Sequence, residues 1–235
     1  MSSITLTWHG HANFQLRHTA GKDHADVLVD PFFTGNPKAG LKPDDIKKPD
    51  IVLVTHTHGD HIGDAPSICK NTGALLGIPV GMAGFFTGIA ESQILNGHGF
   101  NIGGSMTAKG VTVTMTQAFH TTDNIAPVGY IIRFSDGYTV YHAGDTGIFA
   151  GMGILGELYA IDLALLPAGG VYTMDTHQAA YAAKLLKAKA VVPMHWGTFP
   201  ALAQNMEGFP AALAEHGASR AIVMRPGETV ELAGK

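Results

Sequence analysis

Residues 50–61 read Asp50-Ile51-Val52-Leu53-Val54-Thr55-His56-Thr57-His58-Gly59-Asp60-His61. The first half of this run is apolar and β-branched between two polar ends, which is typical of a strand buried on both faces of its sheet. The second half places three imidazoles and a carboxylate directly after that strand, and such side chains bind metal ions. The run therefore predicts a buried strand whose end carries a metal site.

The spacing within the histidine run suits two neighbouring metal ions better than one. In extended backbone, residues two apart point the same way, so His56 and His58 can bind a single ion. Gly59 permits a sharp turn, which would direct Asp60 and His61 toward a different point.

Three further residues of metal-binding types follow other predicted strands. His120, Asp145 and His195 each come at or just after the end of an apolar, strand-like run. Strand ends that share one edge of a sheet bring such residues together although they lie far apart in the sequence. The resulting set of five imidazoles and two carboxylates is larger than one tetrahedral zinc ion can use.

The rest of the chain predicts many short strands with a few helices between them. Helices are expected over residues 64–71, 81–91, 176–187 and 209–216. Strands are expected over residues 4–8, 13–17, 26–30, 50–55, 74–76, 111–119, 128–134, 139–142, 162–167, 190–194, 221–225 and 229–232. Because no linker or repeat divides the chain, we predict a single domain over residues 1–235.

Composition limits the class of partner. Of the 235 residues, 46% are hydrophobic, only 14% are charged and 30 are glycines, which indicates a large core and many tight turns. The formal charge is −4 and the 15 lysines and arginines are scattered, so the sequence argues against nucleic acid as a partner.

The sequence gives weaker evidence about cellular location and oligomeric state. Cys69 is the only cysteine, so no intramolecular disulfide can form. With no signal peptide and no apolar run of membrane-spanning length in the sequence, a cytoplasmic protein is expected. The apolar, glycine-rich segment 81–91 would suit an interface of a homo-oligomer.

Four phrases of the sequence together resemble the metallo-β-lactamase superfamily. They narrow the resemblance to its subgroup of uncharacterised metal-dependent hydrolases close to the ascorbate-6-phosphate lactonases. The likeness runs from about Leu6 to Phe199. The phrases are Thr55-His56-Thr57-His58-Gly59-Asp60-His61-Ile62-Gly63-Asp64, Asn101-Ile102-Gly103-Gly104, Tyr141-His142-Ala143-Gly144-Asp145-Thr146-Gly147 and Pro193-Met194-His195-Trp196-Gly197-Thr198-Phe199-Pro200.

The resemblance implies an α/β (α+β) fold, a four-layer αββα sandwich with the site at one edge. It also implies a division of ligands between two divalent ions. The first ion would be held by His56, His58 and His120, the second by Asp60, His61 and His195, with Asp145 bridging them. Imidazole and carboxylate ligands suit zinc, the first choice, and also manganese or iron.

General chemistry then predicts the reaction. A water shared by two divalent ions loses a proton near neutral pH and gives a hydroxide nucleophile. It would cleave an ester-like bond, such as a lactone or a phosphoester, in a small metabolite. Asp60 can reach the shared water and is the expected catalytic proton acceptor. The sequence leaves the substrate, the native metal and the oligomeric state open.

Three other functions fit the fold less well. A phosphodiesterase or nuclease acting on RNA or a nucleotide is the main alternative, and the lack of a basic patch counts against RNA. A di-iron redox protein would normally carry a flavin domain, for which the chain has no room. The complete ligand set argues against a non-catalytic scaffold.

Several other side chains have two interpretations each. His11 suits either a pocket role or turn chemistry, and Asp30 is either a carboxylate behind a ligand or a turn residue. His142 is expected to support Asp145 from the preceding strand. Aromatic residues that fit either the core or a pocket wall are Phe32, Phe33, Trp196 and Phe199. Histidines expected at the surface are His18, His24, His98, His177 and His216.

Overall fold

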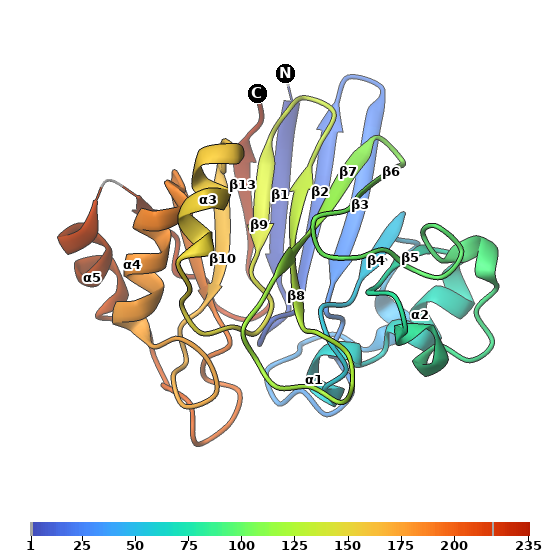
Figure 1. Ribbon diagram of the computed structural model, residues 1–235, viewed down its shortest axis with the longest axis horizontal. Coiled ribbons are helices and arrows are strands. Elements are labelled where there is room, and N and C mark those ends of the chain that lie inside the picture. Colours follow the sequence, from blue (N-terminus) through green and yellow to red (C-terminus); the bar gives the residue numbers. More distant parts are fainter. Residues whose placement is uncertain (1, 218) are drawn as a thin grey trace.

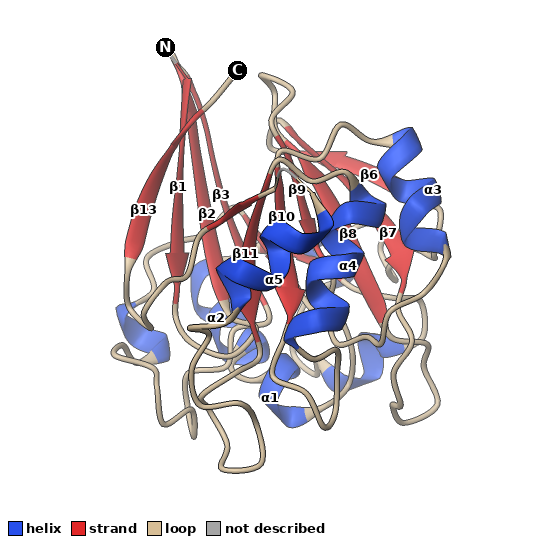
Figure 2. Cartoon of the chain, turned by 90° about the vertical axis from the view of Figure 1, so that its left-hand side faces the viewer, coloured by secondary structure: helices blue, strands red, loops and turns tan. Residues whose placement is uncertain are grey.

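A computed structural model describes residues 2–217 and 219–235. Met1 and Ala218, which the single-domain prediction also covers, lie outside the described residues. Within the described part, two β-sheets lie face to face and helices cover their outer faces (Figures 1 and 2). This arrangement confirms the predicted αββα sandwich.

Both sheets are mixed, with parallel and antiparallel neighbours. The first sheet has the strand order β13 (Thr229–Ala233), β1 (Ser2–Trp8), β2 (Phe14–Ala20), β3 (Asp23–Val29), β4 (Ile51–Leu53) and β5 (Leu75–Gly77). The second has the order β12 (Arg220–Ala221), β11 (Ala190–Met194), β10 (Leu163–Pro167), β9 (Thr139–His142), β8 (Val128–Arg133), β7 (Val111–Gln117) and β6 (Ser105–Ala108).

The main core lies between the two sheets. Along β1, Ile4, Leu6 and Trp8 are fully buried, while the alternate residues Thr5 and Thr7 are half-buried on the outer face. This period of two is what a strand with one covered face requires. By contrast, every residue of β10 is buried, because helices cover the other face of the second sheet.

The helices divide between the two outer faces. α2 (Ala65–Thr72) follows the short α1 (Gly59–Ile62) and packs Ile68 and Cys69 on the outer face of β3–β5. The second sheet is covered by α3 (Gly151–Leu158), α4 (Thr176–Leu186) and α5 (Phe209–His216) (Figure 2). Among the described residues, the other elements are the short 3₁₀ turns η1 (Pro43–Asp45), η2 (Met82–Phe85) and η3 (Glu91–Gln93).

Several boundaries differ from the sequence prediction. Over residues 81–91 only the short turn η2 and the start of η3 form, because Gly81 and Gly88 adopt positive φ angles of 93° and 84°, which end a helix. α3 and β6 were not expected from the sequence. His18 was expected at the surface, but its side chain is 2% exposed and faces Asp136.

The ends of several strands meet at one end of the sandwich. α1, which carries part of the histidine run, lies at the opposite end from the two chain termini (Figure 1). Among the described residues, no helix combines the length and apolarity that crossing a membrane requires.

Candidate metal centre

The first group of histidines forms directly beyond β4. His56 is fully buried, and its Nε2 lies 3.0 Å from Nδ1 of His58. His58 has extended backbone angles and is the N-cap of α1, so the turn expected at Gly59 is the first turn of a helix. His120, from the loop after β7, completes the group: one ligand atom from each histidine lies within 4.8 Å of the others.

A second group lies beside the first and contains His11, Asp60, His61 and His195, again with ligand atoms within 4.8 Å of one another. Asp60 and His61 belong to α1, whereas His195 follows β11 and has a φ of 58°. The structure therefore brings all seven predicted ligands together. Their role as ligands stays a prediction.

Asp145 lies between the two groups. Its Oδ2 is 3.0 Å from Nε2 of His195, 3.3 Å from Nε2 of His61 and 3.6 Å from Nε2 of His120. One carboxylate oxygen therefore contacts imidazoles assigned to both ions, which is the position that a bridging ligand needs.

His11 differs from the neighbouring histidines of the centre, because both of its ring nitrogens have hydrogen-bond partners. A carboxylate only accepts hydrogen bonds, so Nε2 of His11 donates to Oδ2 of Asp60 (3.1 Å), and Nδ1 accepts from the Thr198 hydroxyl (3.1 Å). Burial lowers the pKa of His11 to about 4, which keeps this neutral form at pH 7. His11 is fully buried and contacts Asp60 from behind, and its own φ of 59° places it in a turn.

Buried polar atoms in the centre lack hydrogen-bond partners among the described residues. Two of them are His61 Nε2 and Asp145 Oδ1. Buried polar atoms are normally paired, and lone pairs of imidazole and carboxylate are satisfied well by a divalent cation. The donor set therefore fits zinc, manganese or iron.

The electrostatics of the centre also favour a bound cation. Burial acts to lower the pKa of His61, but Asp145 and Asp30 on either side outweigh burial and raise it well above its usual range. Burial acts to raise the pKa of Asp145, but His61 and His195 hold it well below its usual range. His61 thus lies between two carboxylates that favour positive charge at this point.

Asp30 fixes the orientation of His61 from behind. Its Oδ1 accepts from the backbone N–H of Thr55 (2.8 Å), and its Oδ2 accepts from the Thr55 hydroxyl and from Nδ1 of His61 (both 2.7 Å). This bond leaves Nε2 of His61 free to face the centre. The structure thus identifies Asp30 as a supporting carboxylate, which the sequence could not distinguish from a turn residue.

His142 supports the centre less directly than expected. Its Nε2 donates to the carbonyl of Ala12 (2.9 Å), and its Nδ1 accepts from the backbone N–H of Gly144 (3.2 Å). These bonds tie the loop that carries Asp145 to the turn that carries His11. They involve the backbone next to Asp145 and not its carboxylate.

A cavity of about 240 Å³ opens beside the centre. Of the four aromatic residues that fitted a pocket wall, Phe199 lines this cavity, whereas Phe32 and Phe33 are buried and Trp196 packs on Trp8 at 5.1 Å. Tyr172, which the sequence did not single out, also lines it. The complete lining is His58, Asp60, His120, Thr121, Asp145, Tyr172, His195 and Phe199.

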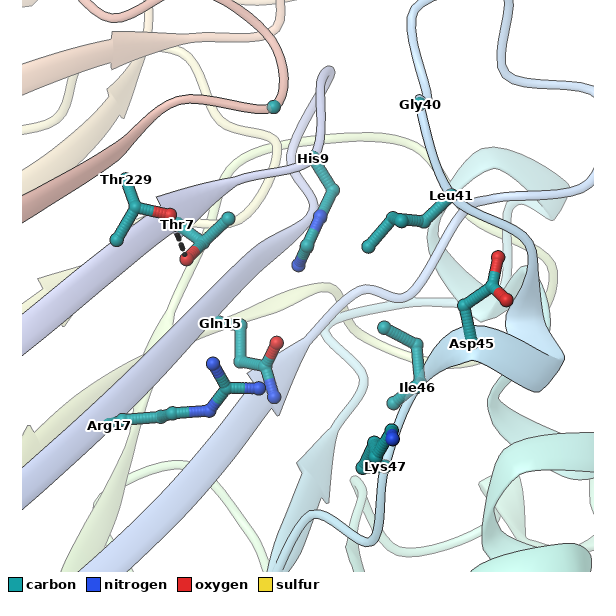
Figure 3. Close-up of a pocket in the computed structure, with 11 residues that line it drawn as sticks. Thr7, His9, Gln15, Arg17, Gly40, Leu41, Asp45, Ile46, Lys47 and Thr229 are labelled. Atoms are coloured by element: carbon teal, nitrogen blue, oxygen red, sulfur yellow. Dashed lines mark hydrogen bonds between the residues drawn. The ribbon is translucent and has the colours of Figure 1, made fainter.

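A separate cavity of about 360 Å³ lies on the outer face of the first sheet, under the loop around residues 40–47. In Figure 3 the ring of His9 points into it, above Gln15 and beside Leu41. Burial lowers the pKa of His9 to about 4. None of the described residues that line it is a predicted ligand, so this cavity does not belong to the metal centre.

Comparisons with known proteins show which family the chain is similar to. The beta-lactamase superfamily domain matches residues 25–196. A "UPF0173 metal-dependent hydrolase" of Nitratidesulfovibrio vulgaris is 54% identical, covering 97% of this chain and 95% of that protein. One from Methanopyrus kandleri is 41% identical, covering 97% of this chain and all of that protein. The structure of Igni18, a metallo hydrolase of Ignicoccus hospitalis, superimposes with a TM-score of 0.87 at 38% identity, covering 99% of this chain and 100% of that chain.

Proposed function

Because this chain belongs to the beta-lactamase superfamily and is one of its metal-dependent hydrolases, we propose that it cleaves an uncharged ester-like bond, a lactone or carboxylic ester, in a small metabolite at a two-ion centre. The observation that carries the proposal is the position of Asp145, whose Oδ2 contacts His61, His120 and His195 at 3.0–3.6 Å. One oxygen shared by two groups of imidazoles suits two ions better than one.

The proposed division of ligands follows the two groups. His56, His58 and His120 hold one ion, and Asp60, His61 and His195 hold the other, with Asp145 between them. Zinc is the first choice and manganese or iron the alternatives. When bound, two such ions lower the pKa of a shared water and polarise the substrate oxygen.

Asp60 is the proposed proton acceptor. Its side chain is 27% exposed and lines the cavity, so it can face both the centre and a substrate. Burial acts to raise the pKa of Asp60, but the hydrogen bond from His11 and the charge of His61 outweigh burial and hold it below its usual range. His11 fixes the oxygen that it bonds, which leaves the other carboxylate oxygen to accept a proton.

The cavity wall supports an uncharged substrate over a phosphorylated one. No lysine or arginine is found among the described residues that line the cavity, whereas sites for phosphate normally supply such cations. Phe199 and Tyr172 offer aromatic surface on which an apolar part of the substrate can pack. A single cysteine, buried in α2, is consistent with action in the cytoplasm.

A substrate panel tests this proposal. Purified protein loaded with zinc or with manganese is assayed on lactones, aryl carboxylic esters, thioesters, phosphodiesters and a phosphorylated lactone. We expect kcat/KM for the uncharged lactones or esters to exceed that for the phosphorylated compounds by about tenfold or more, since a missing cation costs about 1.4 kcal/mol or more.

Two results would contradict the proposal. A preference of similar size for phosphodiesters or the phosphorylated lactone would show that the substrate class is wrong. Metal content well below one ion per chain after supplementation would show that the two-ion centre is wrong.

A further inference from the structure

A second cluster of metal-binding residue types lies on the outer helical layer, away from the cavity of the metal centre. His177 is in the first turn of α4, and Glu215 and His216 are in the last turn of α5. α4 and α5 pack against each other over the second sheet (Figure 2). One ligand atom from each of the three residues lies within 4.8 Å of the others.

These side chains have no other partner that would explain the cluster. Within residues 2–217 and 219–235, none of the three makes a side-chain hydrogen bond or an ion pair, and Nε2 of His216 is buried without a hydrogen-bond partner. The rings of His177 and His216 lie 5.0 Å apart at 61°. Tyr181 packs against His216 at 5.3 Å and limits the movement of its ring.

We propose that His177, Glu215 and His216 form a peripheral binding site for a divalent ion of the zinc class. Two imidazoles and one carboxylate are a donor set that zinc uses with a water in the fourth position. Ligand atoms of one tetrahedral zinc lie about 3.3 Å apart, which follows from bond lengths of about 2.0–2.1 Å. His177 and Glu215 are exposed, and the proposal requires their side chains to rotate until the three atoms reach that separation.

The ends of the two helices act on this site in opposite directions. The C-terminal end of α5 carries partial negative charge, which favours a cation, and the N-terminal end of α4 carries partial positive charge, which opposes it. The carboxylate of Glu215 therefore supplies the net negative charge that the site needs. This dependence makes Glu215 the most informative residue to change.

An ion at this site would connect the end of α5 to the start of α4. α4 follows the loop that carries Tyr172 of the catalytic cavity, and Met174 in this loop donates from its backbone N–H to the carbonyl of Thr146 (3.2 Å). Binding would thus stabilise the helical layer that supports one wall of the cavity. It does not depend on the proposed reaction.

The test counts bound zinc in the full-length protein. Wild type, His177→Ala/His216→Ala and the control His24→Ala/His98→Ala, which removes two exposed histidines elsewhere, are dialysed against a series of Zn²⁺ concentrations and analysed for metal. Ions at the main centre contribute equally to all three proteins and cancel in the comparison. We expect wild type and control to bind one more ion per chain, at micromolar Zn²⁺, than the double variant.

A conservative variant keeps the test independent of folding. Glu215→Gln keeps both imidazoles and the size of the side chain, and we expect it to weaken the additional ion by about tenfold or more. Addition of micromolar Zn²⁺ should also raise the thermal stability of wild type. It should not raise the thermal stability of Glu215→Gln. Equal zinc content in wild type and the double variant, or an additional ion bound only at millimolar Zn²⁺, would overturn the proposal.

Discussion

Asp60 and His11 form a pair in which one residue sets the position of the other. The hydrogen bond of 3.1 Å between them fixes one carboxylate oxygen of Asp60 at the edge of the cavity. Because His11 occupies this oxygen, the proposed roles of ligand and proton acceptor both fall on the other carboxylate oxygen. The consequence is testable at Asp60 itself.

Replacing Asp60 with Ala should abolish hydrolysis while leaving the fold intact. The side chain is 27% exposed and its loss removes one hydrogen bond, to His11, so the midpoint of thermal unfolding should change by only a few degrees at most. The rate should fall by about 100-fold or more, since general bases contribute about 10²–10⁴-fold. Steady-state rates and the circular dichroism spectrum measure both effects. Retained activity would remove Asp60 from the mechanism.

Asp30 acts through His61, so its replacement should weaken metal binding without removing a ligand. Asp30→Asn keeps the size of the side chain but loses the charge that faces Nδ1 of His61 and the Thr55 hydroxyl. We expect metal affinity to fall by about 10–100-fold, the range measured for groups that orient metal ligands. Competition with a chelator measures it. An unchanged affinity would show that His61 does not depend on Asp30.

The candidate site shows what residue patterns can and cannot predict. The seven ligand positions follow from strand ends and from the family resemblance, and the structure brings all of them together. The supporting role of Asp30 depends on its φ of 45° and on contacts with Thr55 and His61, 25 and 31 residues away. Such long-range contacts leave no local signal in the sequence.

At the scale of elements, the turn between β9 and Asp145 passes close both to β8 of its own sheet and to Thr55, which follows β4 of the first sheet. Gly144 has a φ of 62°, and a Cβ at this position would clash with the carbonyl of Val128 and crowd Thr55. Only glycine combines this angle with such a close approach. The position of Asp145 therefore depends on a backbone feature one residue before it.

Gly144→Ala should destabilise the protein and disturb the centre together. We expect a loss of about 1–3 kcal/mol in the free energy of unfolding, from strain and steric overlap, and lower metal content after dialysis. Gly153→Ala in α3 is the matched control. A Cβ there meets no described atom within 4 Å, and alanine favours a helix by about 1 kcal/mol. Denaturant unfolding compares the two variants, and equal stabilities would contradict the role given to Gly144.

Two segments show opposite ways in which the local sequence pattern fails to predict a helix. A poor, glycine-interrupted helix is expected over residues 81–91, but glycines at positive φ limit this segment to short 3₁₀ turns. α3 contains Gly151, Gly153 and Gly156, a composition that argues against a helix, yet it forms. Its fully buried Met152 packs in the main core, and this tertiary contact outweighs weak helix propensity.

At the scale of the whole molecule, polar side chains connect the two sheets at both ends of the sandwich, and each end uses a different set of groups. One end carries the metal centre. At the other, the turn between β8 and β9 lies near the termini (Figure 1), and Asp136 of this turn contacts His18 of the first sheet and the backbone of Lys235. Its Oδ2 accepts from the backbone N–H of Lys235 (3.1 Å) and lies 3.2 Å from Nε2 of His18, while its Oδ1 accepts from the N–H of Tyr138 (2.9 Å).

This contact should make the stability of the protein depend on acid pH through Asp136. Burial acts to raise its pKa, but hydrogen bonds from Tyr138, Ser2 and Lys235 lower it from 3.8 to about 2. A carboxyl whose pKa is lower in the folded state contributes stability that is complete above its unfolded value and lost as pH falls through the folded value. The contribution should therefore be present above about pH 4 and disappear near pH 2.

Asp136→Asn should accordingly cost up to about 2 kcal/mol of unfolding free energy at pH 7, because each unit of pKa shift corresponds to about 1.4 kcal/mol. The difference from wild type should shrink between pH 4 and pH 2, since protonated Asp136 resembles the amide. Asp44→Asn, at an exposed position in η1, serves as control and should match wild type throughout. Urea unfolding at several pH values measures the difference. If Asp136→Asn lowered the free energy of unfolding by the same amount at pH 7 and near pH 2, the contribution of Asp136 would come from its packing and not from its charge.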